Sequence, residues 1–119
     1  MMQAWGRSRA SLDATGRTSD ARLVARARRG DAVAFDELVA RHLRSAYAVA
    51  LSEVLVPEAA TAACQDAFLR ALDELDRCTY PAQFLPWLLQ ITRQCAADAR
   101  KRGFTSAAAQ NGSGALRTT

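Results

Sequence analysis

Residues 57–75 read PEAATAACQDAFLRALDEL and carry the most regular pattern in the chain. Their apolar positions recur at intervals of three or four, at Ala60, Ala63, Cys64, Ala67, Phe68, Ala71, Leu72 and Leu75. This spacing places them on one face of an α-helix and predicts that the face is buried. Pro57 suits the first turn of a helix, where its missing N–H is not needed. We therefore expect a helix that begins at Pro57 and packs through Phe68 and Leu72.

Two amphipathic segments precede this one. The first covers residues 20–29, with Ser19 as N-cap and Gly30 as the stop, and its apolar stripe is Leu23, Val24 and Ala27. The second is capped by Asp31 and reaches about Leu55. Its stripe comprises Phe35, Leu38, Val39, Leu43, Ala46, Tyr47, Ala50, Leu51 and Val54. Both patterns predict helices with one buried face.

A polar loop, DRCTYPAQ at residues 76–83, separates the helix at Pro57 from a last one that begins near Phe84. Pro86 is tolerated there because it falls in the first turn. We expect Phe84, Leu88, Ile91 and Cys95 to face inward, with Trp87 packed beside them.

Four amphipathic helices with short connections predict an all-α fold, a small four-helix bundle, over residues 20–102. Residues 1–19 and 103–119 lack periodicity and are rich in Gly, Ser and Thr. We expect them to form a flexible N-terminal arm and a flexible C-terminal tail.

Composition fits one soluble domain of 119 residues. The net charge is +4, and the sixteen basic residues are all arginine except Lys101, which modestly favours an anionic partner. Apolar stretches are short and interrupted by charge, and the N-terminus lacks the apolar core of a signal peptide. We therefore expect no membrane segment and a cytoplasmic location.

Enzymatic and metal-binding roles have little support in the sequence. There is one histidine, no phosphate-binding Gly loop and no carboxylate pair at a suitable spacing. Cys64, Cys78 and Cys95 form no CxxC pair, and only His42 could join them around zinc. The preferred interpretation is that the cysteines are reduced thiols that serve as small apolar residues and that the histidine lies on a helix surface. We expect no catalytic residue, metal or cofactor.

Three segments, taken together, resemble region two of the extracytoplasmic-function (ECF) bacterial sigma factors. DARLVARARRGDAVAFDELVARH at 20–42 is similar to the family's opening helix, its Gly-Asp turn and the start of the next helix. QDAFLRAL at 65–72 is similar to the polymerase-binding helix. FLPWLLQITRQCAADARKR at 84–102 is similar to the Phe-x-x-Trp-Leu element that runs into a basic, promoter-facing helix. The three segments occur in the family's order and spacing.

The resemblance implies a DNA-binding transcription initiation domain. Such a domain docks on the clamp helices of the largest subunit of core RNA polymerase and captures the minus-ten promoter element as the strands separate. The residues that correspond to polymerase contacts are Gln65, Asp66, Leu69 and Arg70. Without the resemblance, this polar helix face with one exposed leucine would be interpreted as a solvated surface.

The resemblance also assigns DNA contacts. The loop at 76–83 corresponds to the family's pocket for a flipped base, for which Arg77, Thr79, Tyr80 and Gln83 offer a cation, a hydroxyl, a stacking ring and an amide. On the last helix the candidates are Gln90, Arg93, Gln94, Arg100, Lys101 and Arg102. Long cations suit phosphates, and glutamine suits base edges. The last three basic residues would also complement the helix dipole, but Arg93 lies too early in the helix for that.

Three departures from the family pattern support a second hypothesis. Thr61 and Ala62 stand where the family has an acidic pair, Gln94 replaces an asparagine, and no helix-turn-helix domain is expected after Arg102. The alternative is therefore a stand-alone, sigma-like protein-interaction module that regulates transcription without opening promoters. An anti-sigma factor is a further partner that could bind the same surfaces.

Overall fold

The computed structural model describes residue 12 and residues 16–115, and for residues 103–115 the backbone alone. This part of the chain forms four α-helices, α2 (Asp20–Arg28), α3 (Ala32–Val54), α4 (Pro57–Asp73) and α5 (Phe84–Ala115). Two short 3₁₀ turns, η1 (Leu75–Arg77) and η2 (Pro81–Gln83), lie between α4 and α5. The prediction of an all-α, four-helix fold is confirmed. Most of the predicted N-terminal arm, residues 1–19, lies outside the described residues.

The helices begin and end where local chemistry directs. The Ser19 hydroxyl accepts a hydrogen bond from the backbone N–H of Arg22 at 3.2 Å, which caps α2. The carboxylate of Asp31 does the same for α3, accepting from the N–H of Ala34 at 3.1 Å. Gly30 has a φ of 94°, a conformation that favours glycine, and it separates the two helices as expected.

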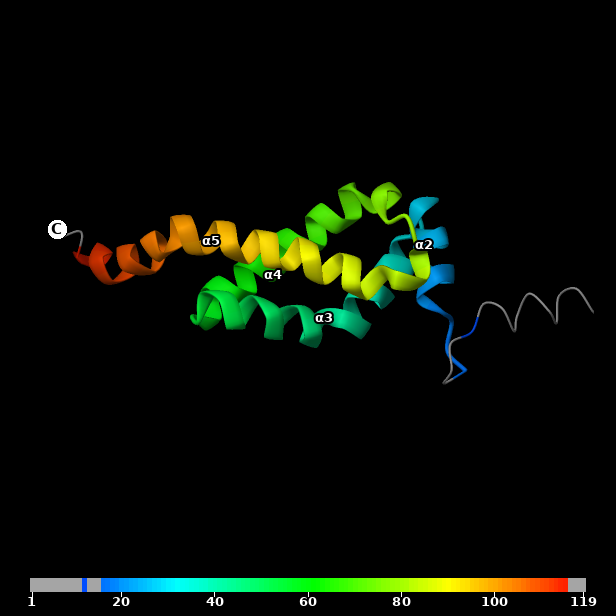
Figure 1. Ribbon diagram of the computed structural model, residues 1–119, viewed down its shortest axis with the longest axis horizontal. Helices are drawn as coiled ribbons and strands as arrows, with labels where there is room; N and C mark the ends of the chain where they lie inside the picture. The colour runs from blue at the N-terminus through cyan, green and yellow to red at the C-terminus, as the bar shows by residue number, and fades with distance from the viewer. Residues whose placement is uncertain (1–11, 13–15, 116–119) are drawn as a thin grey trace, which may run out of the picture.

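Helices α3, α4 and α5 pack lengthwise against one another, and α2 packs across one end of them (Figure 1). Fully buried side chains from all four helices form the core, and the largest include Phe84, Leu38, Leu88 and Val24. The predicted inward face of α5 is confirmed, because Phe84, Leu88, Ile91 and Cys95 are buried. Thr92 is buried as well, and its hydroxyl donates to the Leu88 carbonyl at 2.9 Å.

Two leucines predicted to lie in the core are exposed. Leu43 of α3 is 46% exposed and Leu72 of α4 is 44% exposed, so both predictions are wrong. The apolar stripes of α3 and α4 are wider than the contacts these helices make with each other and with α5. Side chains at the edge of each stripe therefore remain in contact with solvent.

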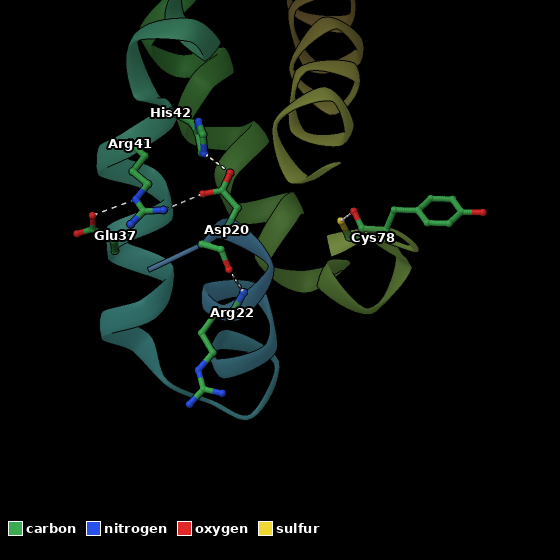
Figure 2. Close-up of polar contacts among 8 residues, drawn as sticks. Asp20, Arg22, Glu37, Arg41, His42 and Cys78 are labelled. Carbon is green, nitrogen blue, oxygen red and sulfur yellow. Dashed lines mark hydrogen bonds and ion pairs between the residues drawn. The ribbon is translucent and has the colours of Figure 1, made fainter. Parts of the chain in front are cut away.

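Asp20 ties the start of α2 to the middle of α3 (Figure 2). One carboxylate oxygen accepts from Nη1 of Arg41 at 3.1 Å, and the other lies 2.8 Å from Nε2 of His42. Arg41 also donates to Glu37 at 3.1 Å, and its side chain is only 6% exposed. A guanidinium so deeply buried needs these carboxylates, because an unpaired buried charge is strongly destabilising.

The backbone of α5 stays helical to Ala115, whereas the sequence predicts a tail from residue 103. The end of α5 extends past the other helices in Figure 1. The alanines at 107–109 favour helix. Extending an existing helix is also easier than starting one, because each further residue adds a backbone hydrogen bond. Residues 116–119 lie outside the described part of the chain.

Phe84→Ala tests whether the start of α5 anchors the core. Removing this buried ring is expected to lower the free energy of unfolding by about 3–5 kcal/mol, through reduced apolar burial and the cavity left behind. Urea denaturation followed by circular dichroism measures it. Leu69→Ala is the control, since a 64% exposed leucine is expected to change stability by no more than about 0.5 kcal/mol.

Asp31 should make stability depend on acid. A hydrogen bond from Arg26 and the capped N–H of Ala34 lower the pKa of the Asp31 carboxyl below its ordinary value of 3.8. The ionised form therefore stabilises the folded state above that pH, and the stabilisation is lost as the pH falls through the folded pKa. Unfolding of wild type and Asp31→Asn should differ most at neutral pH and converge below about pH 4. A constant difference across this range would contradict the assignment.

Candidate functional site

An apolar groove runs along the α3–α4 junction, on the side that the other helices leave open. Its volume is about 840 Å³, and it is lined by Phe35, Val39, Leu43, Arg44, Tyr47, Thr61, Cys64, Gln65, Phe68 and Leu69. We call it the α3–α4 groove. Arg44 is the only charged residue among these, so the groove is suited to an apolar surface of a partner.

The structure groups some of the predicted polymerase contacts and separates others. Gln65 and Leu69 both line the α3–α4 groove. Asp66 is exposed but does not line the groove. Arg70 is partly buried, and its Nε donates to the carboxylate of Glu74 at 3.2 Å. A partner in the groove would therefore contact Gln65 and Leu69 together. Arg70 already forms an ion pair with Glu74, the residue that follows α4.

A second, smaller hollow lies where η1, η2 and the first turns of α5 meet. Its volume is about 270 Å³, and it is lined by Arg77, Cys78, Thr79, Tyr80, Gln83, Pro86, Trp87 and Gln90. We call it the loop pocket. Its lining includes all four loop residues that the sequence analysis proposed as DNA contacts, and also Gln90 of α5. A ring, two amides, a hydroxyl and a guanidinium thus converge around one cavity.

Burial of one residue and exposure of its neighbours give the loop its shape. Cys78 is buried, and its thiol donates to the carbonyl of Tyr80 at 3.7 Å (Figure 2). The Tyr80 side chain is 71% exposed, and the Thr79 hydroxyl donates to the carbonyl of Arg77 at 3.4 Å. The loop is therefore anchored inward at Cys78 while an aromatic ring remains available at its surface.

All six DNA candidates of α5 are exposed, namely Gln90, Arg93, Gln94, Arg100, Lys101 and Arg102. Arg100 pairs with Glu53 of α3 at 3.4 Å. Within the described residues, Arg93 and Lys101 have no ion pair. These two cations are thus free to meet phosphates, and Arg100 is already partly neutralised.

The cysteines and His42 do not form a site with one another. Burial raises the pKa of the Cys64, Cys78 and Cys95 thiols. His42 is engaged with Asp20, and its ring lies 5.7 Å from that of Phe84. Across the described residues, no three side chains of His, Cys, Asp or Glu gather as metal ligands. In the same part of the chain, no helix has the length and apolar character to cross a membrane.

Two sets of lining residues were not identified as functional from the sequence. Val39, Leu43 and Tyr47 belong to a stripe that periodicity assigns to the core, yet they line the α3–α4 groove. Trp87 packs on Phe84, with ring centroids 5.9 Å apart, and also lines the loop pocket. For the α3 residues, the sequence offered one signal of this exposure: the apolar stripe of α3 is wider than the surface that one helix–helix contact can bury.

Comparison with known proteins covers two of the three segments that carry the resemblance, 65–72 and 84–102, and only the end of the segment at 20–42. Residues 38–103 match the family model described as Sigma-70 region 2. Over 65 residues the chain is 40% identical to the probable RNA polymerase sigma factor RfaY of Xanthomonas campestris pv. campestris, an alignment covering 55% of this chain and 16% of that protein. The chain therefore spans only a small part of this relative. No solved structure matches it. The loop pocket and the α4 wall of the groove lie inside the matched segment, and α2 precedes it.

Proposed function

The chain belongs to the Sigma-70 region 2 family, and from that premise we propose that it is a transcription initiation domain of ECF sigma type. In this proposal it acts in the cytoplasm, binds core RNA polymerase and captures unpaired bases of the minus-ten element. Neither step makes or breaks a covalent bond in the chain. One observation carries the proposal. The α3–α4 groove contains Gln65 and Leu69, which the resemblance assigns to polymerase, and the loop pocket contains the loop residues that it assigns to DNA.

The α3–α4 groove supports the polymerase-binding step. An open apolar groove between two helices can accept a helix of a partner, and the resemblance names the clamp helices of the polymerase largest subunit as the partner. Leu69 offers an exposed apolar anchor on the wall of the groove, and Gln65 offers an amide for hydrogen bonds beside it. An anti-sigma helix that covered the same groove would compete with polymerase.

The loop pocket supports base capture. A cavity of about 270 Å³ has room for a nucleobase. The exposed Tyr80 ring can stack on a base, and the Gln83 and Gln90 amides can hydrogen-bond to its edge. Since a base reaches such a pocket only after leaving the duplex, this arrangement favours unpaired DNA.

The outer face of α5 would hold the strand that carries the captured base. Arg93 and Lys101 are exposed cations on the helix that also supplies Gln90 to the pocket. Cations of this kind contact phosphates and position the strand without reading its sequence. The net charge of +4 acts in the same direction.

The second candidate function is a protein-interaction module that does not open promoters. The size of the α3–α4 groove favours it, together with Thr61 and Ala62, which are exposed on α4 where the family has carboxylates. Promoter-specific transcription by this chain with core polymerase would exclude this alternative.

Polymerase binding is tested by retention of core polymerase on the immobilised domain. The double variant Gln65→Ala, Leu69→Ala should bind at least about tenfold more weakly, because truncating a side chain at the centre of an interface typically costs about 1 kcal/mol or more. Val33→Ala is the matched control, since it shortens an exposed apolar residue of α3 that does not line the groove. Failure of the wild type to retain polymerase would refute this step.

Base capture is tested by fluorescence anisotropy with a labelled single-stranded oligonucleotide and its duplex. Tyr80→Ala should weaken single-strand binding by about 1–3 kcal/mol, the range for one stacked base, whereas Tyr80→Phe keeps the ring and the affinity. Arg93→Ala with Lys101→Ala should flatten the salt dependence by about 0.7 for each phosphate that the protein no longer neutralises. Equal affinity of wild type and Tyr80→Ala would remove the pocket from the proposal.

A further inference from the structure

Arg28, near the end of α2, contacts the backbone of the segment that forms the loop pocket. Its Nε and Nη2 atoms donate to the carbonyl of Leu75 at 3.2 and 3.1 Å, and Nη2 also donates to the carbonyl of Cys78. These two carbonyls lie at the start of η1 and just after it. One guanidinium therefore bridges both ends of the turn that presents Arg77.

The interaction continues from Cys78 to Tyr80. The Cys78 thiol donates to the Tyr80 carbonyl, and the Cys78 carbonyl accepts from Arg28. Cys78 therefore links Arg28 to Tyr80 through two hydrogen bonds. Figure 2 shows Cys78 with its sulfur directed at that oxygen. Helix α2 also packs against both η1 and η2, and Figure 1 shows it beside this end of the bundle. The wall of the loop pocket is thus supported from α2.

Ion pairing does not explain this arrangement. Asp76 Oδ1 lies 3.8 Å from Arg28 Nε, but the Asp76 side chain is 94% exposed, and such pairs contribute little. The short contacts of Arg28 are to uncharged carbonyls. The planar guanidinium presents its N–H donors in a rigid fork that meets two carbonyls at once, whereas the ammonium of lysine is a compact group on a flexible stem. The shape of the side chain matters here more than its charge.

We infer that Arg28 is a positioning residue that holds residues 75–80 in the conformation that accepts a base, with α2 acting as a brace. This inference rests on the function proposed above for the loop pocket. It assigns a role to a helix that precedes the segment matched by the family model. Arg28 does not line the loop pocket, so it acts through Cys78 and Tyr80.

Hydrogen exchange tests the brace without any nucleic acid. The N–H groups of Arg77 and Cys78 donate within the turn, to the carbonyls of Glu74 and Leu75. Arg28→Ala should speed their exchange by about tenfold, the effect of removing a hydrogen bond to a charged group. Arg29→Ala is the matched control, because it removes the same charge at the neighbouring position, whose side chain does not hydrogen-bond to Leu75 or Cys78. Unchanged exchange in Arg28→Ala would overturn the inference.

Single-strand binding then tests the consequence for the pocket. Arg28→Ala should bind the oligonucleotide about threefold to tenfold more weakly than Arg29→Ala, because the loop must be ordered at the moment of binding. Its salt dependence should equal that of Arg29→Ala, and retention of polymerase should be unchanged. A slope flatter by about 0.7 would make Arg28 a phosphate contact and would overturn the positioning role.

Arg28→Lys separates geometry from charge. Lysine keeps the positive charge without the planar fork, so exchange and affinity should fall between those of wild type and Arg28→Ala. Full restoration by lysine would show that charge alone is needed and would refute the bridging role. If Tyr80→Ala bound the oligonucleotide as tightly as the wild type does, the proposed function of the pocket would be refuted. The exchange data would still decide whether Arg28 braces the loop.

Discussion

The packing of α5 against α3 and α4 sets the positions of the α3–α4 groove and the loop pocket. Phe84 and Leu88 of α5 are fully buried in the core, and α5 packs against both α3 and α4 (Figure 1). Because α5 covers the α3–α4 pair from one side, the opposite side of that pair remains open. The α3–α4 groove is the direct result, since apolar side chains such as Leu43 and Leu69 line it and stay partly exposed.

The same packing determines where the loop pocket forms. The chain must turn from the end of α4 to the start of α5, and it does so through two 3₁₀ turns separated by a buried cysteine. Cys78 draws the middle of the turn inward, which leaves Tyr80 at the surface beside Trp87. Polar groups from the loop and from the first turns of α5 therefore line the same hollow.

Helix α2 is held at both ends by polar contacts with distant parts of the chain. At its start, Asp20 binds the buried Arg41 and His42 of α3. At its end, Arg28 binds carbonyls that follow α4. Because buried polar groups must find partners, these contacts fix the position of a short helix with only a narrow apolar stripe. They place α2 against the loop rather than along the bundle.

Local sequence was enough to predict where the helices begin, their caps and the family resemblance, but not where α5 ends or which surfaces stay open. Ser19, Asp31 and Pro57 mark helix starts through hydrogen bonding and backbone geometry that depend on neighbouring residues alone. Leu43 and Leu72 satisfy the helical period, yet solvent reaches them, because a period reports direction around one helix and not what lies opposite it. Arg28 and Cys78 are fifty positions apart, and no local pattern links them. The loop residues of the pocket followed from the family resemblance, but burial and long-range hydrogen bonding depend on how helices are placed in space, so the groove, Trp87 in the pocket wall and the contacts of Arg28 became visible only in the folded chain.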